Sequence, residues 1–402
     1  MDICVQYLEG GSHPVPPTPA EARARLRAAF EILPIEMVLL GWDLSPELVE
    51  ACAEECQARG AGLFLWHPLL SGRRDLHPAK RWQVVGLDGQ PVAGHAGKAE
   101  FTFVCPNQPA AREAVLAHLD TALASGWYQG VFLDRIRFPS PAANPERDLG
   151  CFCGSCLTSA AEADVDLADL QAQLRSSMRT PEGRRSAVRG LLTEHARNEG
   201  DAPQDALDWL LEFRRQSVTH LAQSAAATAR ARGMLLGLDC YSPTLARMVG
   251  QDLAALAAFS DWIKIMTYVR AFGPACIPFE VLGLADWLMT SGAAAEPDAL
   301  GLLADAAGWP LPATREEIRR GRLPSEILTA EITRGRAAGA AALWAGIELV
   351  DLPGVCRPDL TTVRRDARAV RRGSPDGVVL SWDLWFMPRQ NLEAAAAQYG
   401  PT

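Results

Sequence analysis

Lysine is scarce in this chain of 402 residues. Of the 39 basic residues, only Lys80, Lys98 and Lys264 are lysine, and the others are arginine. With the many alanines this indicates a compositional bias, so a lysine inside a structural element needs an explanation. Acids outnumber bases, and the formal net charge is -9 with an isoelectric point near 5.4. This balance argues against a nucleic acid or an anionic membrane as partner.

Long apolar runs and targeting signals are also missing. No uninterrupted apolar stretch approaches the roughly 18–20 residues of a membrane helix. The first residues, MDICVQYLEGG, carry neither the charged segment nor the apolar core of a secretory signal. We therefore expect a soluble, cytoplasmic protein whose 10 cysteines are thiols or metal ligands rather than a disulfide framework.

Apolar strand-like runs alternate with alanine- and leucine-rich stretches, a pattern typical of βαβ units and a parallel sheet. The predicted strands are Ile3–Leu8, Ile35–Gly41, Gly62–Trp66, Gly130–Asp134, Leu235–Asp239, Trp262–Tyr268, Ala342–Glu348 and Val378–Trp382. The predicted helices are Pro19–Phe30, Pro46–Arg59, Ala110–Ser125, Ala206–Arg232, Asp252–Phe259, Pro324–Ala337, Leu360–Arg371 and Leu392–Gln398. These pairs predict an α/β fold, a (β/α)8 TIM barrel forming a single domain over residues 1–402.

Three predicted connections are long, and all follow strands: His67–Gln108, Pro139–Gln204 and Val269–Leu323. They predict insertions after strands 3, 4 and 6. Loops after strands form the active-site face of a barrel, so the extra residues gather where a ligand would bind. An open doubly wound sheet is the alternative, because it also binds ligands at strand ends.

Acidic residues end four predicted strands: Asp134, Asp239, Glu348 and Asp383. In a closed barrel they would converge around one axis. Glycoside hydrolysis uses two carboxyl groups that flank the scissile bond. We therefore expect Asp134 as nucleophile or base and Glu348 as acid, with Asp239 as the competing choice for the acid.

Asp134 is followed by Arg135 and Arg137. A buried carboxylate is costly unless it is paired or used. One reading is a structural Asp134–Arg137 pair. The other is a catalytic carboxylate that a neighbouring guanidinium holds ionised.

Tryptophans also gather in and beyond the strands, and sugar rings present apolar faces that stack on indole. About half of these tryptophans are expected to fill the barrel instead. The residues predicted to line a sugar site are Gln6, Trp66, His67, Arg135, Arg137, Tyr241, Lys264, Tyr268, Trp344, Trp382 and Asp383.

By strand alternation, Lys264 shares the inner face with Trp262, Met266 and Tyr268. A buried lysine must be paired or must have a lowered pKa. A salt bridge to a pocket carboxylate is the favoured interpretation. The alternative is a Schiff-base lysine, which would make the protein a lyase or aldolase.

Three cysteines, Cys151, Cys153 and Cys156, follow the fourth strand in a C-x-C-x2-C run within residues 139–204. Such a run can fold onto one tetrahedral metal ion. Cys105 is the candidate fourth ligand, because it should lie on the same barrel face. The prediction is a structural zinc site, with reduced free thiols as the alternative. Cys52 and Cys56 are expected to be packing residues.

The segment GVFLDRIRFP, residues 130–139, resembles the fourth-strand motif of bacterial glycoside-hydrolase-like barrels. Cys105-Pro-Asn107, Trp209–Arg214 and Asp261–Tyr268 resemble the corresponding segments of that group, in the same order. The cysteine run is similar to the zinc cluster on the barrel of certain bacterial β-galactosidases. Those enzymes carry an Asn-Glu pair after the fourth strand, where this chain has Asp134-Arg135, so their catalytic assignment does not transfer.

The resemblance implies a (β/α)8 barrel with Asp134 as the principal catalytic carboxylate. The predicted function is therefore a glycosidase-like hydrolase with a carbohydrate substrate, a structural zinc ion and no organic cofactor. A non-catalytic carbohydrate-binding barrel and a Schiff-base lyase using Lys264 are the alternatives.

Overall fold

The computed structural model describes residues 1–10, 13, 15–71, 80–94, 99–192, 203–339 and 342–400. Parts of the predicted connections His67–Gln108 and Pro139–Gln204 fall outside these residues. Eight parallel strands pair in sequence order, and β1 pairs with β8, so the sheet closes into a barrel. The predicted (β/α)8 barrel is confirmed, and the open sheet is excluded.

All eight predicted strands form, with ends that differ from the prediction by a residue or two. The observed strands are β1 (Asp2–Tyr7), β2 (Met37–Leu40), β3 (Gly62–Pro68), β4 (Gly130–Asp134), β5 (Leu235–Tyr241), β6 (Trp262–Met266), β7 (Leu343–Glu348) and β8 (Gly377–Ser381). Nearly every residue in them is buried, as expected for parallel strands covered on both faces.

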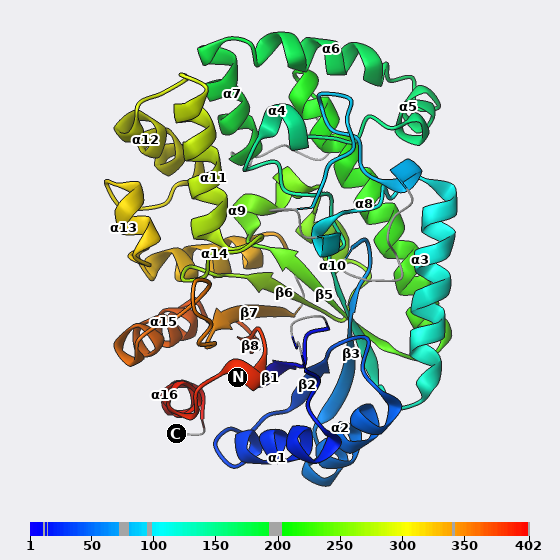
Figure 1. Cartoon of the computed structure of the whole chain (residues 1–402), viewed down its shortest axis with the longest axis vertical. Helices are drawn as coiled ribbons and strands as arrows, with labels where there is room; N and C mark the ends of the chain where they lie inside the picture. Colours follow the sequence, from blue (N-terminus) through cyan, green and yellow to red (C-terminus); the bar gives the residue numbers. More distant parts are fainter. Residues whose placement is uncertain are drawn as a thin grey trace.

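The helices surround the sheet (Figure 1). Those close to the predicted ranges are α1 (Pro19–Phe30), α2 (Pro46–Arg59), α3 (Pro109–Ala122), α8 (Ala206–Ala231), α10 (Leu253–Ala257), α14 (Glu326–Ala337), α15 (Leu360–Gly373) and α16 (Arg389–Tyr399). Their starts carry clear signals. Thr18 and Glu21 form a capping box at α1, and Ser45 caps α2.

Further helices occupy the long connections. Between β4 and α8 lie α4 (Pro145–Asp148), α5 (Gly154–Ala161), α6 (Leu167–Ser177) and α7 (Pro181–Leu192). After β5 comes α9 (Pro243–Ala246), and after β6 come α11 (Ile277–Thr290), α12 (Glu296–Ala307) and α13 (Arg315–Arg319). No helix is predicted from the sequence in these segments. Several of the helices are short, and α11 is apolar on most of its faces, so it lacks an amphipathic stripe. Over the described part of the chain, no helix is both long and apolar enough to cross a membrane.

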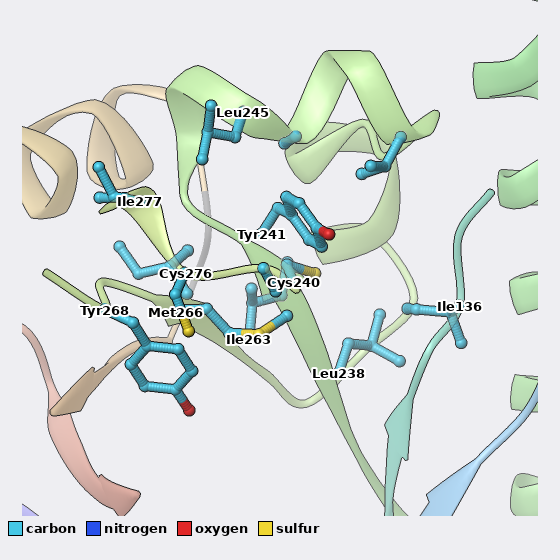
Figure 2. Packing of buried hydrophobic residues seen from close by; sticks show 14 of the residues in the cluster. Ile136, Leu238, Cys240, Tyr241, Leu245, Ile263, Met266, Tyr268, Cys276 and Ile277 are labelled. Carbon is cyan, nitrogen blue, oxygen red and sulfur yellow. The ribbon is translucent and has the colours of Figure 1, made fainter. Parts of the chain in front are cut away.

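Alternation along the strands separates two apolar clusters. One fills the barrel interior and consists of Cys4, Leu39, Trp42, Phe64, Trp66, Phe132, Trp262, Trp344 and Val379. The other lies mainly between the sheet and the helices and extends into the loops after the strands. Figure 2 shows part of it around β5 and β6, where Leu238, Cys240 and Ile263 contact their neighbours.

Gly237 makes room for the stack inside the barrel. A Cβ added there would lie 2.3 Å from the Trp262 ring, which stacks on Phe132 with centroids 5.0 Å apart. We expect Gly237→Ala to lower the free energy of unfolding by about 1–3 kcal/mol through overpacking. Gly301→Ala, at an exposed position of α12 where an added Cβ would meet no atom within 4 Å, should raise it by up to about 1 kcal/mol. Urea unfolding of both variants measures the difference, and equal effects would contradict this packing.

Candidate active site

Asp134 ends β4 at the carboxyl-terminal face of the barrel. Its carboxylate accepts a hydrogen bond from Trp66 Nε1 at 3.1 Å and one from the Arg135 backbone N–H at 2.5 Å. The side chain of Asp134 is 13% exposed, against 3% for Asp239 and 1% for Asp383. Among the strand-end acids, Asp134 is thus the one that a ligand reaches most readily.

Arg135 follows Asp134 in a strained backbone conformation, with φ at 55°. This region costs a residue other than glycine about 1–3 kcal/mol, and such strain concentrates at functional sites. The conformation places the Arg135 guanidinium 4.0 Å from Asp134 and 3.6 Å from Glu9. Of the two flanking arginines, Arg135 is therefore the one beside Asp134. The structural Asp134–Arg137 pair does not form.

Asp239 and Lys264 form a buried ion pair inside the barrel, with Nζ 2.9 Å from Oδ2. Lys264 Nζ also donates to the Tyr268 hydroxyl at 2.5 Å. The favoured interpretation of Lys264, a salt bridge to a pocket carboxylate, is confirmed. Burial, together with the negative charge of Asp134, raises the pKa of Asp239 to about 7, and Lys264 opposes this shift. Asp239 Oδ1 has no hydrogen-bond partner among the described residues.

Glu348 ends β7 and accepts hydrogen bonds from three consecutive backbone N–H groups, those of Val269, Arg270 and Ala271. Both carboxylate oxygens are used. Burial raises the pKa of Glu348 to about 7, although these N–H groups oppose the shift. Glu348 therefore fastens the loop that follows β6.

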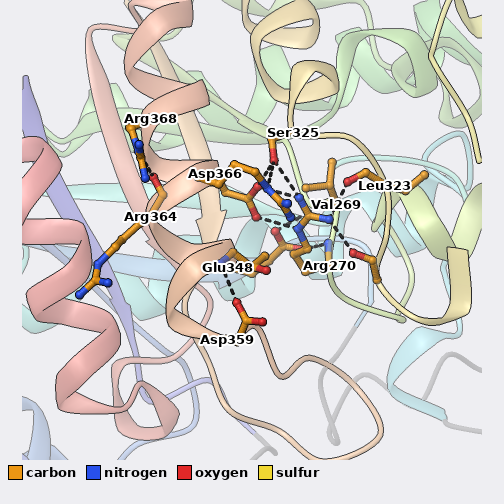
Figure 3. A network of polar contacts seen from close by, with 12 residues as sticks. Val269, Arg270, Leu323, Ser325, Glu348, Asp359, Arg364, Asp366 and Arg368 are labelled. Carbon is orange, nitrogen blue, oxygen red and sulfur yellow. Dashed lines mark hydrogen bonds and ion pairs between the residues drawn. The ribbon is translucent and has the colours of Figure 1, made fainter. Parts of the chain in front are cut away.

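The same loop is held from its other side by Arg270, whose guanidinium forms a bidentate pair with Asp366 of α15 at 2.7 Å. Arg270 also donates to Ser325 Oγ and to the carbonyl oxygen of Leu323. Figure 3 shows this network beside Glu348.

Asp383 holds the loop that follows β1. Its carboxylate accepts from the backbone N–H groups of Leu8, Glu9 and Trp385, and it lies 2.7 Å from His13 Nε2. With its side chain 1% exposed and its oxygens already engaged, Asp383 supports the loops rather than presenting an acid to a ligand.

Two residues predicted to bind sugar lie elsewhere. His67 is on the outer face of β3, because its neighbour Trp66 points inward, and its ring stacks on His118 of α3. Trp344 lies near the start of β7 rather than its end, and its ring packs on Trp262 deep in the barrel. The predicted positions of both residues are therefore wrong, since neither side chain lies at the carboxyl-terminal face of the barrel.

Several other predicted residues do gather near the carboxyl ends of the strands. Trp382 lies 5.7 Å from the Tyr268 ring and is half-buried. Gln6 is buried inside the barrel, and its Oε1 has no hydrogen-bond partner in the described part of the chain. Trp66 positions Asp134 through its indole N–H and is otherwise buried in the interior cluster.

Arg137 is held between two aromatic rings, Phe103 at 4.5 Å and Tyr241 at 4.8 Å from its guanidinium carbon. Tyr241 in turn donates to Glu280, a buried acid of α11. Burial raises the pKa of Glu280, and its hydrogen bonds with Ser140, Ala275 and Tyr241 oppose the shift. Glu9, Phe103 and Glu280 are not predicted from the sequence. Of these, only Glu280 could have been recognised locally, because it is an acid inside an otherwise apolar segment.

The four predicted cysteine ligands form one cluster. The Sγ atoms of Cys105, Cys151, Cys153 and Cys156 all lie within 4.8 Å of one another. In a tetrahedral site with Zn–S bonds of about 2.3 Å, sulfur atoms would be about 3.8 Å apart. The residues therefore fit a tetrathiolate metal site. Hydrogen bonding with the other three thiols lowers the pKa of Cys153. Cys52 and Cys56 lie buried in α2.

Backbone and side-chain N–H groups surround the sulfur atoms. The Val85 N–H donates to Cys151 Sγ at 3.3 Å, and Asn107 donates to Cys105 and Cys156 at 3.4 Å. Arg214 of α8 is fully buried nearby, and its Nε and one terminal nitrogen have no partner among the described residues. Burial lowers the pKa of Arg214 to about 9, and the charges of Cys151 and Cys156 oppose this. A negatively charged cluster would thus supply the counter-charge that this guanidinium lacks.

No family model matches the chain, and no curated protein matches it. Among solved structures it is similar to β-galactosidases from the psychrophilic Marinomonas ef1 and from the Antarctic haloarchaeon Halorubrum lacusprofundi. The identities are 12% and 14%, with TM-scores of 0.57 and 0.60. In both cases 99% of this chain is covered, but only 59% and 57% of the β-galactosidases, so the chain spans less than two thirds of their length.

The glycoside hydrolase domain of PgaB (BpsB) from Bordetella bronchiseptica is similar over its whole length, with 13% identity and a TM-score of 0.54. The alignment covers 100% of this chain and 99% of that domain. The predicted resemblance to glycoside-hydrolase barrels is confirmed at the level of the fold.

The hydrogen bonds of Glu348 generate a prediction about stability. Glu348→Ala would leave three buried N–H groups without their acceptor, so we expect the free energy of unfolding to fall by about 3 kcal/mol. Glu393→Ala, which removes an exposed partner of Arg389, should change it by less than about 1 kcal/mol. Chemical unfolding of both variants compares them. If Glu348→Ala is as stable as Glu393→Ala, Glu348 does not hold the loop.

Proposed function

We propose that this protein is a glycosidase-like hydrolase that acts on a glycoside or oligosaccharide, with Asp134 as its principal catalytic carboxylate. The observation that carries the proposal is the pair of acids at neighbouring positions of β4 and β5. Leu133 pairs with Leu238 in the sheet, so Asp134 and Asp239 follow side by side on the inner face. The glycoside-hydrolase folds of the similar structures support the choice of reaction.

Adjacent strands are about 4.8 Å apart, and a retaining mechanism needs two carboxyls roughly 5–5.5 Å apart, so acids on neighbouring strands suit that mechanism. Asp134 would attack the anomeric carbon while the glycosidic C–O bond breaks. Asp239 would give its proton to the leaving oxygen and later take one from the water that releases the sugar from Asp134. A pKa of about 7 suits a group that must both hold and return a proton.

The positioning of Asp134 follows from its neighbours. Trp66 and the Arg135 backbone N–H fix the carboxylate, and the guanidinium of Arg135 offsets its charge. Tyr268, Trp382 and Gln6 would contact the sugar. We assign the acid role to Asp239 rather than Glu348, because three backbone N–H groups already occupy the Glu348 carboxylate.

The ion pair of Lys264 disfavours the lyase alternative. A Schiff-base lysine must present a neutral amine to a carbonyl carbon, whereas Lys264 is fully buried and its Nζ donates to Asp239 and Tyr268. The remaining alternative is a barrel that binds carbohydrate without catalysis. The activity measurements below distinguish it from a hydrolase.

The four clustered cysteines would hold a structural zinc ion, consistent with their mutual distances and with the N–H groups around them. Bound there, zinc would join the segment before α3 to the segment after β4 and would leave no coordination position for substrate. The tetrathiolate would also face Arg214 with a compensating negative charge.

Variants of the two acids test the mechanism. Asp134→Asn should lower hydrolysis of all glycosides by about 10²–10⁴-fold or more. Asp239→Asn should impair alkyl glycosides far more than 4-nitrophenyl glycosides, because nitrophenolate leaves without a proton. The measurement is kcat/KM over both substrate series, with thermal unfolding to establish that each variant folds. Equal impairment of both series by Asp239→Asn would remove the acid role. An inactive wild-type chain that binds sugars would indicate the non-catalytic barrel.

The pH dependence of the reaction follows from the pKa of Asp239. A proton donor must be protonated, so activity should be present below pH 7 and fall as the pH rises through about 7. Glu348 has a similar pKa, so the variants decide between them. The alkaline limb should persist in Glu348→Gln and disappear in Asp239→Asn. The reverse pattern would make Glu348 the acid.

Metal content tests the cysteine cluster. We expect about one zinc per chain by elemental analysis of the purified protein. Cys153→Ser should lose the metal and melt at a lower temperature, whereas Cys52→Ser, a buried thiol of α2, should keep its zinc. A wild-type chain without metal would contradict the site.

A further inference from the structure

A cavity of about 340 Å³ lies among the loops that follow β3, β4 and β6. Three phenylalanines, Phe101, Phe103 and Phe279, form much of its wall together with prolines. Its volume is at the lower end of the roughly 300–1,000 Å³ of ligand pockets, which suits one sugar ring. Apolar walls of this kind accommodate the C–H faces of a sugar.

Arg137 contributes a buried positive charge to this cavity. Arg137 is about 4% exposed, and among the described residues no ion pair forms between its guanidinium and a carboxylate. One terminal nitrogen donates to the Phe138 carbonyl oxygen at 3.1 Å, while Nε has no partner among those residues. The other arginine of the wall, Arg147, is already neutralised by a bidentate pair with Asp148.

The aromatic rings on either side of Arg137 fix the plane of its guanidinium. A planar guanidinium matches the two oxygens of a carboxylate, and Arg137 Nε is buried without a hydrogen-bond partner among the described residues. We propose that this cavity is a subsite for an acidic sugar, in which the carboxylate of a uronic acid pairs with Arg137. The substrate class would then be a glycan that contains uronic acid.

The subsite lies among the loops on the same face of the barrel as the proposed catalytic centre. The Phe101 ring forms part of the cavity wall and also lies 5.0 Å from the guanidinium carbon of Arg135, which is beside Asp134. The Phe101 ring and the Arg135 guanidinium therefore lie in sequence between the cavity and Asp134. This inference rests on the proposed function for its biological meaning, but binding of the acidic sugar does not require catalysis.

The test is calorimetric binding to the full chain carrying Asp134→Asn, so that no turnover occurs. Methyl glucuronide and methyl glucoside form a matched pair that differs only in the carboxylate. The glucuronide should bind at least tenfold more tightly than the glucoside. Arg137→Met should abolish this preference. Arg137→Lys, which keeps the charge without the planar fork, should retain part of it, and Arg364→Met on α15 is the control arginine.

Equal affinity for the two glycosides, no binding of either, or a preference that survives Arg137→Met would overturn the proposal. Tighter binding of glucose 6-phosphate than of the glucuronide would overturn the assignment of the anion to a carboxylate. A glucuronide preference in a chain that hydrolyses no glycoside would support the subsite and refute the hydrolase. Hydrolysis of glycosides with no effect of Arg137→Met on acidic substrates would support the hydrolase and refute the subsite.

Discussion

Charge buried at the mouth of the barrel constrains the rest of this structure. An ionised group that leaves water must find a partner, because its desolvation costs several kcal/mol. Glu348 and Asp383 meet this requirement with backbone N–H groups, so their charges order the loops after β6 and β1. When Asp239 is ionised, its partner is Lys264. Asp134 differs, because it combines partners within the protein with an exposed edge. The four acids therefore differ in what each one contacts and in how much of it a ligand can reach.

The loops that carry the site depend on one another. Cys105 precedes α3, and Cys151, Cys153 and Cys156 follow β4, so the cysteine cluster brings together the segments on either side of Asp134. The Val85 and Phe152 backbones add hydrogen bonds between the same two segments. Arg135 continues this connection by donating to the Glu100 carbonyl oxygen. Loops anchored in this way can hold Phe101 and Phe103 in fixed positions over the barrel.

The strands could be predicted from sequence because a parallel strand covered on both faces is a continuous apolar run, and the cysteine ligands because their spacing is local. For Lys264 and Asp134, the sequence predicts the type of partner, a carboxylate or a guanidinium, but not which residue provides it. Which acid contacts which cation depends on side-chain geometry over distances that no local pattern records. Arg137 shows this well, since its aromatic neighbours lie 34 residues before it and 104 residues after it in the chain. The predicted position of His67 is wrong because successive residues of a strand point to opposite faces of the sheet, and Trp66 already points inward.

The scarcity of lysine and the burial of Lys264 together give the barrel an internal reporter. An amine-reactive reagent can modify Lys264 only when the strands around it separate, since its side chain is fully buried and its amine is bonded to Asp239 and Tyr268. Only two other lysines and the N-terminus compete for the reagent. The rate at which the peptide containing Lys264 gains mass therefore measures how often this barrel opens under native conditions.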